Sequence, residues 1–265
     1  MSATFAVEHG AATVRPAEAA PAVERVDTPE AAWNAWEPLA EVPRLALDDC
    51  LPADARLVVI APHPYDEVLA CGALMSEHAA RGGEVLVIAV TDEAGRGALR
   101  GRDEESLARA RHAESQSGLA QLAPHHVPEV LRLGLPDGAA AHADELEAPL
   151  RGALRPTDRV VAPWRLDGDP DHEAAATAAA AACAAAGCRL IEAPVWMWHW
   201  AEPGDARVPW QRLRGLALTP ETQNRKRLAL AAYVSQLVPR DHHAGPVLDD
   251  LIVERVEREV EYYLM

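Results

Sequence analysis

Five apolar segments, separated by stretches of helical composition, constrain the fold of this chain more than any other feature. The segments cover residues 56–61, 84–91, 129–138, 158–165 and 189–200. They lack regular alternation of polar and apolar residues, which predicts strands that are buried on both faces. Such strands, alternating with helices, build a parallel sheet with helices on both faces. The sequence therefore predicts a doubly wound α/β domain, whose ligands bind beyond the carboxyl ends of the strands.

The remaining segments are expected to complete the same domain. Residues 1–30 are rich in Ala, Pro and Glu without a clean period, which predicts a flexible N-terminal arm. Residues 31–265 are expected to form a single α/β domain. Helices are predicted at residues 67–83, 104–123, 143–154, 169–187, 220–237 and 248–265, and a further strand at residues 212–219.

Charge and cysteine content restrict the classes of function. The formal net charge of −16 argues against a nucleic-acid binder, which needs a basic face, and favours a protein that acts on a small molecule. No apolar run is long enough to span a membrane. The four cysteines form no CxxC pair, so buried, reduced thiols in a cytoplasmic protein are expected. The composition leaves the oligomeric state open.

Two clusters of histidine and acidic residues follow two of the strands. His63 and Asp66 lie in "HPYDE" directly after the first strand, and His172 lies in "DGDPDHE" directly after the fourth. Because parallel strands open their carboxyl ends onto one edge of the sheet, these side chains are expected to meet there. Two histidines and one carboxylate with an open fourth position form a catalytic zinc site. The alternative is a set of local hydrogen bonds in a turn and in the first turn of a helix.

The two clusters also carry a family resemblance. "APHPYDEVLACGA" resembles the A-H-P-D-D-E signature of the PIG-L/LmbE-like zinc-dependent N-deacetylases, and "DGDPDHEA" resembles their second motif, commonly H-P-D-H. The resemblance covers residues 57–240 and implies a Rossmann-like fold. It also implies removal of acetyl groups from N-acetylglucosamine-type sugars or related amides. By position, His63, Asp66 and His172 match the ligands of zinc or another divalent metal.

Two further positions match residues that often hold sugar hydroxyls in this family. They are Arg111, in "RARHAE", and Asp137, in "LPDG". The alternatives are an exposed helix charge for Arg111 and a turn residue for Asp137.

The chain departs from the family pattern at three positions. Tyr65 stands where the family has the Asp that acts as general base and acid, and a phenol with a pKa near 10 is a poor base at neutral pH. Asp169 stands where many members have a His that helps neutralise the oxyanion, and Tyr233 where related sequences often have His. Loss of general acid–base help costs about 100- to 10,000-fold in rate. Together the departures indicate altered chemistry at this site.

Another residue can take over as the base. Asp169 is the first candidate, if it reaches the water at the metal. Tyr65 itself can instead bind the metal or donate a hydrogen bond. The weaker candidates for the base are Glu67, Asp92, Glu93, His242 and His243.

The aromatic segment "PVWMWHW", residues 194–200, is predicted to continue the fifth strand. In a strand, Trp196, Trp198 and Trp200 share one face. Packing in the core and stacking on a sugar or acyl chain are the two alternatives for this face.

The sequence thus predicts a zinc-dependent hydrolase of an N-acyl amino sugar or a related metabolite, with the usual Asp base replaced by Tyr65. The alternative is a catalytically impaired or repurposed family member that binds or regulates without hydrolysis.

Overall fold

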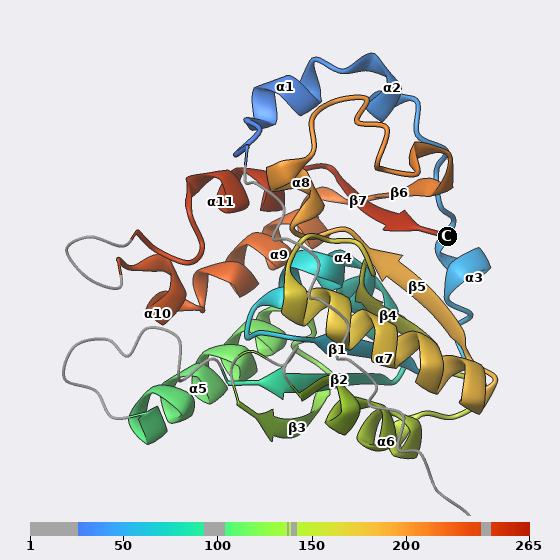
Figure 1. The fold of residues 1–265 in the computed structure, drawn as a ribbon, viewed down its shortest axis with the longest axis vertical. Helices are drawn as coiled ribbons and strands as arrows, with labels where there is room; N and C mark the ends of the chain where they lie inside the picture. Colours follow the sequence, from blue (N-terminus) through green and yellow to red (C-terminus); the bar gives the residue numbers. More distant parts are fainter. Residues whose placement is uncertain (1–25, 93–103, 137, 139–141, 240–244) are drawn as a thin grey trace, which may run out of the picture.

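A seven-stranded sheet forms the centre of the molecule (Figure 1). The computed structural model describes residues 26–92, 104–136, 138, 142–239 and 245–265. The strand order is β3-β2-β1-β4-β5-β7-β6. The strands are β1 (Leu57–Ala61), β2 (Val85–Thr91), β3 (Glu129–Leu135), β4 (Arg159–Pro163), β5 (Arg189–Ala193), β6 (Leu213–Ala217) and β7 (Val260–Leu264).

The pairing of the strands fixes where a ligand can bind. β1 pairs in parallel with β2 on one side and with β4 on the other, and β3 and β5 extend the parallel part outward. β7 pairs antiparallel with both β5 and β6. The strand order reverses between β1 and β4, and the crevice of an open α/β sheet lies beyond the carboxyl ends of such a pair. The predicted mostly parallel sheet is confirmed.

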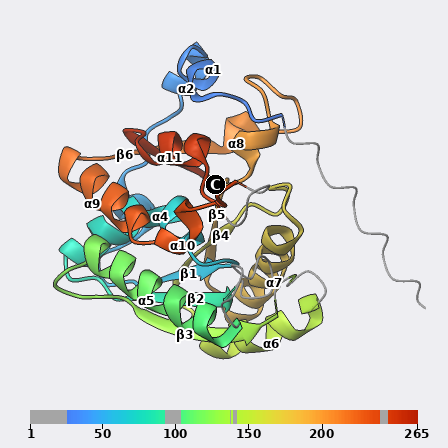
Figure 2. The same ribbon diagram turned by 90° about the vertical axis from the view of Figure 1, so that its left-hand side faces the viewer.

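Helices cover both faces of this sheet, as predicted (Figure 2). One layer contains α4 (Asp66–Ala80), α5 (Glu104–Leu122) and α9 (Pro220–Ala231), and the other contains α6 (Ala143–Ala153) and α7 (Pro170–Ala186).

Strand β1 shows how the sequence produces these two layers. Leu57, Val59 and Ala61 pack in the core under α4. Val58 and Ile60 pack in the core under α6 and α7. Because successive side chains of a strand point to opposite faces, an unbroken apolar run is what a strand between two helical layers requires.

Helices α1 (Glu30–Asn34), α2 (Glu37–Ala40) and α8 (Met197–Trp200) lie at the β6 end of the sheet, at the top of Figure 1. A third apolar cluster there joins Trp33 of the N-terminal segment to Trp198, Trp200 and Leu213. Among the described helices, none has the length and apolarity needed to cross a membrane. The other short helices are α3 (Leu47–Cys50), α10 (Val234–Leu237) and α11 (Asp250–Val256).

The N-terminal arm expected at residues 1–30 falls mostly outside the described residues. Its last residues contact the body of the protein. Thr28 Oγ1 donates to the carbonyl of Ala201 at 2.7 Å. Glu30 accepts two hydrogen bonds, each 2.7 Å long, from the guanidinium of Arg258.

The prediction that residues 189–200 form one strand is wrong beyond Ala193. The strand ends there, and residues 197–200 form the helical turn α8. The carboxylate of Asp167 accepts the backbone N–H groups of Val195, Trp196 and Met197 at 2.9–3.0 Å. Because these donors are taken by a side chain, they cannot join a sheet ladder. The three tryptophans therefore do not share one strand face.

The single C-terminal helix predicted at residues 248–265 is also wrong. Helix α11 ends at Val256, and Val260–Leu264 form β7, which lies between β5 and β6. Within β7, Glu261, Tyr263 and Leu264 are buried. The gain from pairing with two neighbouring strands outweighs the helical pattern of the sequence.

Helix α4 contains a kink that matters for the site at its start. Cys71 has non-helical dihedral angles, φ −157° and ψ 33°. A buried ion pair lies at this break, in which Lys226 Nζ is 2.6 Å from Glu261 Oε1. Glu261 accepts the N–H of Ala73, and Lys226 donates to the carbonyl of Leu69. A regular helix would pair that N–H with that carbonyl, so the ion pair replaces one helical hydrogen bond.

Candidate metal centre

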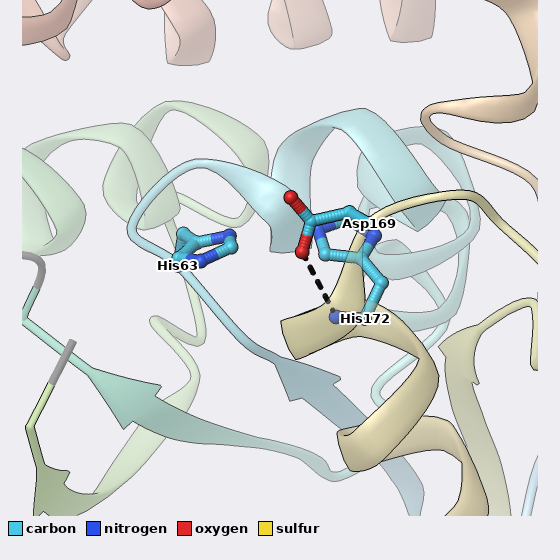
Figure 3. Close-up of side chains that lie close together, drawn as sticks. All are labelled: His63, Asp169 and His172. Atoms are coloured by element: carbon cyan, nitrogen blue, oxygen red, sulfur yellow. Dashed lines mark hydrogen bonds between the residues drawn. The ribbon is translucent and has the colours of Figure 1, made fainter. Parts of the chain in front are cut away.

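The loops after β1 and β4 bring three predicted site residues together (Figure 3). Ligand atoms of His63, Asp169 and His172 all lie within 4.8 Å of one another, close enough to hold one metal ion. His63 comes from the loop between β1 and α4. Asp169 and His172 come from the start of α7, which follows β4. The group lies at the reversal point of the strand order.

Asp66, the third predicted ligand, contacts both imidazoles directly. Its Oδ2 lies 3.2 Å from His63 Nδ1 and 3.0 Å from His172 Nε2. The same oxygen accepts the backbone N–H of His63 at 2.9 Å. In tetrahedral zinc sites with bonds near 2.0 Å, ligand atoms lie about 3.3 Å apart. The two distances from Asp66 Oδ2 to the imidazoles are therefore close to those between zinc ligands.

Two orphaned atoms support the fit of a cation. Within the described part of the chain, Asp66 Oδ1 and His63 Nδ1 are buried and make no hydrogen bond. Buried polar atoms are normally satisfied, so such exceptions mark a place for an ion or a reactive group. A divalent cation provides what a buried carboxylate oxygen and an imidazole nitrogen lack. His63, Asp66 and His172 thus fit a metal ion.

Two further acids hold the histidines in place. Asp167 Oδ2 lies 2.8 Å from His172 Nδ1, and Asp171 Oδ2 lies 3.2 Å from His63 Nε2. A carboxylate on one ring nitrogen fixes the tautomer and leaves the other nitrogen for a metal. Both acids are buried. The sequence placed them in the second cluster but gave no role to either, although a carboxylate partner is expected for a metal-binding histidine.

Electrostatics favours charged groups in this buried cluster. Burial alone would lower the pKa of His63, but Asp171, hydrogen-bonded to its ring, and the neighbouring carboxylate of Asp66 raise it to about 10. Burial alone would raise the pKa of Asp66, but its contacts with His172 and His63 hold it well below its usual range. These carboxylates favour a proton on His63, which a metal ion must displace because imidazole binds a metal only as the neutral base.

Tyr65 lies beside the cluster in an unusual backbone conformation. Its φ is 96°, a region that L-residues avoid and that Asn and Asp tolerate better than bulky residues. The side chain is buried, with its ring stacked on His63 at 6.4 Å and edge-on to Tyr233 at 6.4 Å. Tyr65 therefore places a buried phenol beside His63, where the family resemblance implies a carboxylate.

Glu67 organises the opposite side of Tyr65. Its Oε2 accepts the backbone N–H of Tyr65 at 3.0 Å, and its Oε1 accepts hydrogen bonds from Ser115 Oγ and Tyr233 Oη at 3.1 and 2.6 Å. Burial raises the pKa of Glu67, against these hydrogen bonds. Burial, together with Glu67, also raises the pKa of Tyr233 well above its usual value. Glu67 thus stabilises the loop between β1 and α4, and its carboxylate oxygens bind Tyr65, Ser115 and Tyr233.

Asp169 caps helix α7 and also lies close to His63 and His172. It is the N-cap of α7, where its Oδ1 accepts the N–H groups of Asp171 and His172 at 2.8 and 3.2 Å. Figure 3 shows its carboxylate beside His172 and facing His63. Oδ2 takes part in neither capping bond, and Asp169 is only half-buried. A carboxylate oxygen is therefore present at the metal position for proton transfer or ligation.

The other predicted site residues have mixed outcomes. Arg111 is buried and donates to the carbonyl of Asp92 at 2.9 Å, so it is not an exposed helix charge. The carboxylate of Asp92 lies 2.6 Å from His112 Nε2. Asp137 lies outside the described residues, as do Glu93, His242 and His243.

Comparison with known proteins agrees with this architecture. Residues 58–183 match the model of the PIG-L family, described as GlcNAc-PI de-N-acetylase. No curated protein matches the chain.

Several solved structures share the fold. The zinc-inhibited form of teicoplanin deacetylase Orf2 is 19% identical, with a TM-score of 0.58, over 79% of this chain and 97% of that one. N,N'-diacetylchitobiose deacetylase from Pyrococcus horikoshii is 18% identical, with a TM-score of 0.51, over 79% and 82%. The conserved protein TT1542 from Thermus thermophilus is 23% identical, with a TM-score of 0.57, over 79% and 93%. At these identities the likeness shows a common fold.

Proposed function

Since residues 58–183 of this chain match the model of the PIG-L family, we propose that the protein is a metal-dependent deacetylase of an N-acylated amino sugar or a related amide. The family description and the fold shared with deacetylases support the reaction class. The observation that carries the proposal is the buried set of His63, Asp66 and His172 with an orphaned carboxylate oxygen at the carboxyl ends of β1 and β4.

Each residue of the site has a distinct role in this proposal. His63, Asp66 and His172 would hold the cation, with zinc as the proposed metal. When bound, a divalent cation supplies a Lewis acid that polarises an amide carbonyl and activates water near neutral pH. Asp171 and Asp167 keep the two imidazoles oriented. Arg111 and Asp137 are proposed to bind sugar hydroxyls.

Proton transfer is assigned to Asp169. The Tyr65 phenol is a weak base at neutral pH, whereas the half-buried carboxylate of Asp169 has an oxygen outside the two capping bonds that can accept a proton from water. The departing amine then takes up that proton from the Asp169 carboxyl group. Tyr65 packs against His63 and closes that side of the site.

A second candidate function follows from the same tyrosine. A family member without the usual carboxylate at position 65 can keep the metal and bind an N-acylated sugar without hydrolysing it. The buried phenol directly beside His63 favours this alternative.

Activity on N-acetylated amino sugars, with free amine as the readout, separates the two functions. The deacetylase proposal expects turnover by the wild type and a loss of at least about 100-fold in Asp169→Asn. Asn is also a good N-cap, so α7 should remain intact in this variant. An inactive wild type beside an active Tyr65→Asp variant would establish the non-hydrolytic alternative. Absence of one bound divalent ion per chain would overturn both.

The cytoplasmic location expected from the cysteine pattern remains a prediction.

A further inference from the structure

The indole of Trp196 contacts the candidate metal centre through His172. Trp196 Nε1 donates to His172 Nε2 at 3.2 Å. This is the nitrogen that lies 3.0 Å from Asp66 Oδ2. The other ring nitrogen, Nδ1, is engaged by Asp167. An imidazole nitrogen has one lone pair, so the indole N–H and a metal ion cannot use Nε2 at the same time.

The geometry of this contact is fixed by a single carboxylate oxygen. Asp167 Oδ2 accepts from the ring of His172 at 2.8 Å and from the backbone N–H of Trp196 at 2.9 Å. The ring and the indole are therefore positioned relative to one atom. The neighbouring N–H groups of Val195 and Met197 bind the other oxygen of the same carboxylate and hold the segment in place.

The indole also lines a cavity. The cavity has a volume of about 50 Å³ and lies between α4, α8, α11 and β7, with Leu69, Trp196, His199 and Ile252 in its wall. The indole lies against His199, with ring centroids 4.9 Å apart at 40°. A hydrogen bond of 3.2 Å is lost after a shift of about 1 Å. The cavity leaves unfilled space in contact with Trp196.

We propose that Trp196 is a positioning residue that holds His172 Nε2 until a metal ion takes its place. The indole keeps the imidazole turned toward Asp66 and competes with the incoming ion for the lone pair. Binding of the ion moves the indole toward the cavity. The inference rests on the metal site of the proposed function, but not on catalysis.

The test is the affinity for Co²⁺, followed by its visible absorption and by competition with Zn²⁺. Removal of the competing N–H in Trp196→Phe should tighten binding about fivefold, which corresponds to one ordinary hydrogen bond. Trp198→Phe is the matched control, because Trp198 lies two residues along the same segment and its Nε1 donates to the carbonyl of Pro194 instead. This control should bind with wild-type affinity. Equal or weaker binding by Trp196→Phe overturns the proposal.

A second measurement uses the wild type alone and does not depend on how a variant folds. The chain has 7 tryptophans, whose indole N–H signals can be followed by ¹⁵N–¹H NMR. One equivalent of Zn²⁺ should shift one indole signal far more than the others, since one N–H loses its acceptor. Zn²⁺ binding with no such shift contradicts the proposal. Metal binding with the expected shift but no amide hydrolysis supports it while the proposed deacetylase activity fails.

Discussion

Two buried carboxylates contact helix α4 and differ in how completely the protein satisfies them. Glu261, at the kink, accepts four hydrogen bonds: Oε1 from Ala73 N–H and Lys226, and Oε2 from Leu74 N–H and the hydroxyl of Tyr263. Asp66, in the first turn, has one oxygen between two imidazoles and one without a partner among the described residues.

This difference separates a structural site from a functional one. A buried charge that is fully hydrogen-bonded specifies one conformation, and removing it leaves its partners unpaired. A buried charge with an unused oxygen is costly unless a ligand completes it. Glu261 therefore contributes to folding, whereas Asp66 contributes to binding. Substitutions at Glu261, at Asp66 and at neighbouring residues test this difference.

The largest expected effect is on stability. Glu261→Ala leaves Lys226 buried without its partner, so the free energy of unfolding should fall by about 3–5 kcal/mol in urea denaturation. Glu259→Ala, an exposed acid two residues away, should change it by less than about 0.5 kcal/mol. If the two variants behave alike, Glu261 does not support the kink.

The second effect concerns the metal. Zn²⁺ at 100 times its Kd should raise the free energy of unfolding of the wild type by about 2.7 kcal/mol. Asp66→Asn should abolish the increase, because the amide removes the anionic oxygen between the imidazoles. Glu259→Ala should keep it in full. The same increase in Asp66→Asn would show that the ion binds elsewhere.

A smaller effect is expected from the acid behind the metal ligand. Asp167→Asn should weaken Zn²⁺ binding by about 10- to 100-fold, because Asp167 fixes the tautomer and orientation of His172. Isothermal titration measures this loss. Asp144→Asn, in the exposed first turn of α6, is the control and should bind as the wild type does. Unchanged affinity in Asp167→Asn would show that Asp167 does not orient His172 for metal binding.

The smallest effect is a pair of opposite pH slopes in stability. Although burial would raise the pKa of Glu192, its hydrogen bonds to Arg165 and Arg212 lower it, so its contribution is present above the unfolded pKa of about 4.5 and is lost as the pH falls. Burial raises the pKa of Glu67, so its contribution is present below that value and is lost as the pH rises through the folded pKa.

Urea denaturation from pH 3 to pH 8 tests both signs. Relative to Glu192→Gln, the wild type should lose stability toward acid. Relative to Glu67→Gln, it should lose stability above about pH 4.5. Parallel curves for either pair would contradict the corresponding sign. The effect is small for Glu192 because both of its arginine partners are exposed to solvent, which screens the ion pairs.

The parallel part of the fold could be predicted because its signal is local. In β1, five consecutive apolar residues suffice to indicate a strand between two helical layers. The end of β5 depended on a distant side chain, since Asp167 captures the N–H groups of Val195, Trp196 and Met197. Val260–Leu264 form a strand because the segment pairs with β5 on one side and β6 on the other. The periodicity of the segment itself does not predict this pairing.

The same distinction applies to the site. His63, Asp66 and His172 follow strand ends, so their meeting could be expected from topology alone. The contacts of Trp196 and Asp171 depend on the rotamers of side chains that pack against the histidines, and spacing in the sequence does not encode those. The kink at Cys71 is likewise set by Lys226 and Glu261, which lie more than 150 residues farther along the chain.

The backbone at Tyr65 has a consequence for how this protein can evolve. Its positive φ suits aspartate better than tyrosine, and the hydrogen bond from its N–H to Glu67 involves no side-chain atom of residue 65. Tyrosine and aspartate codons differ by a single base. A single base change therefore suffices to place a carboxylate beside His63 in this protein.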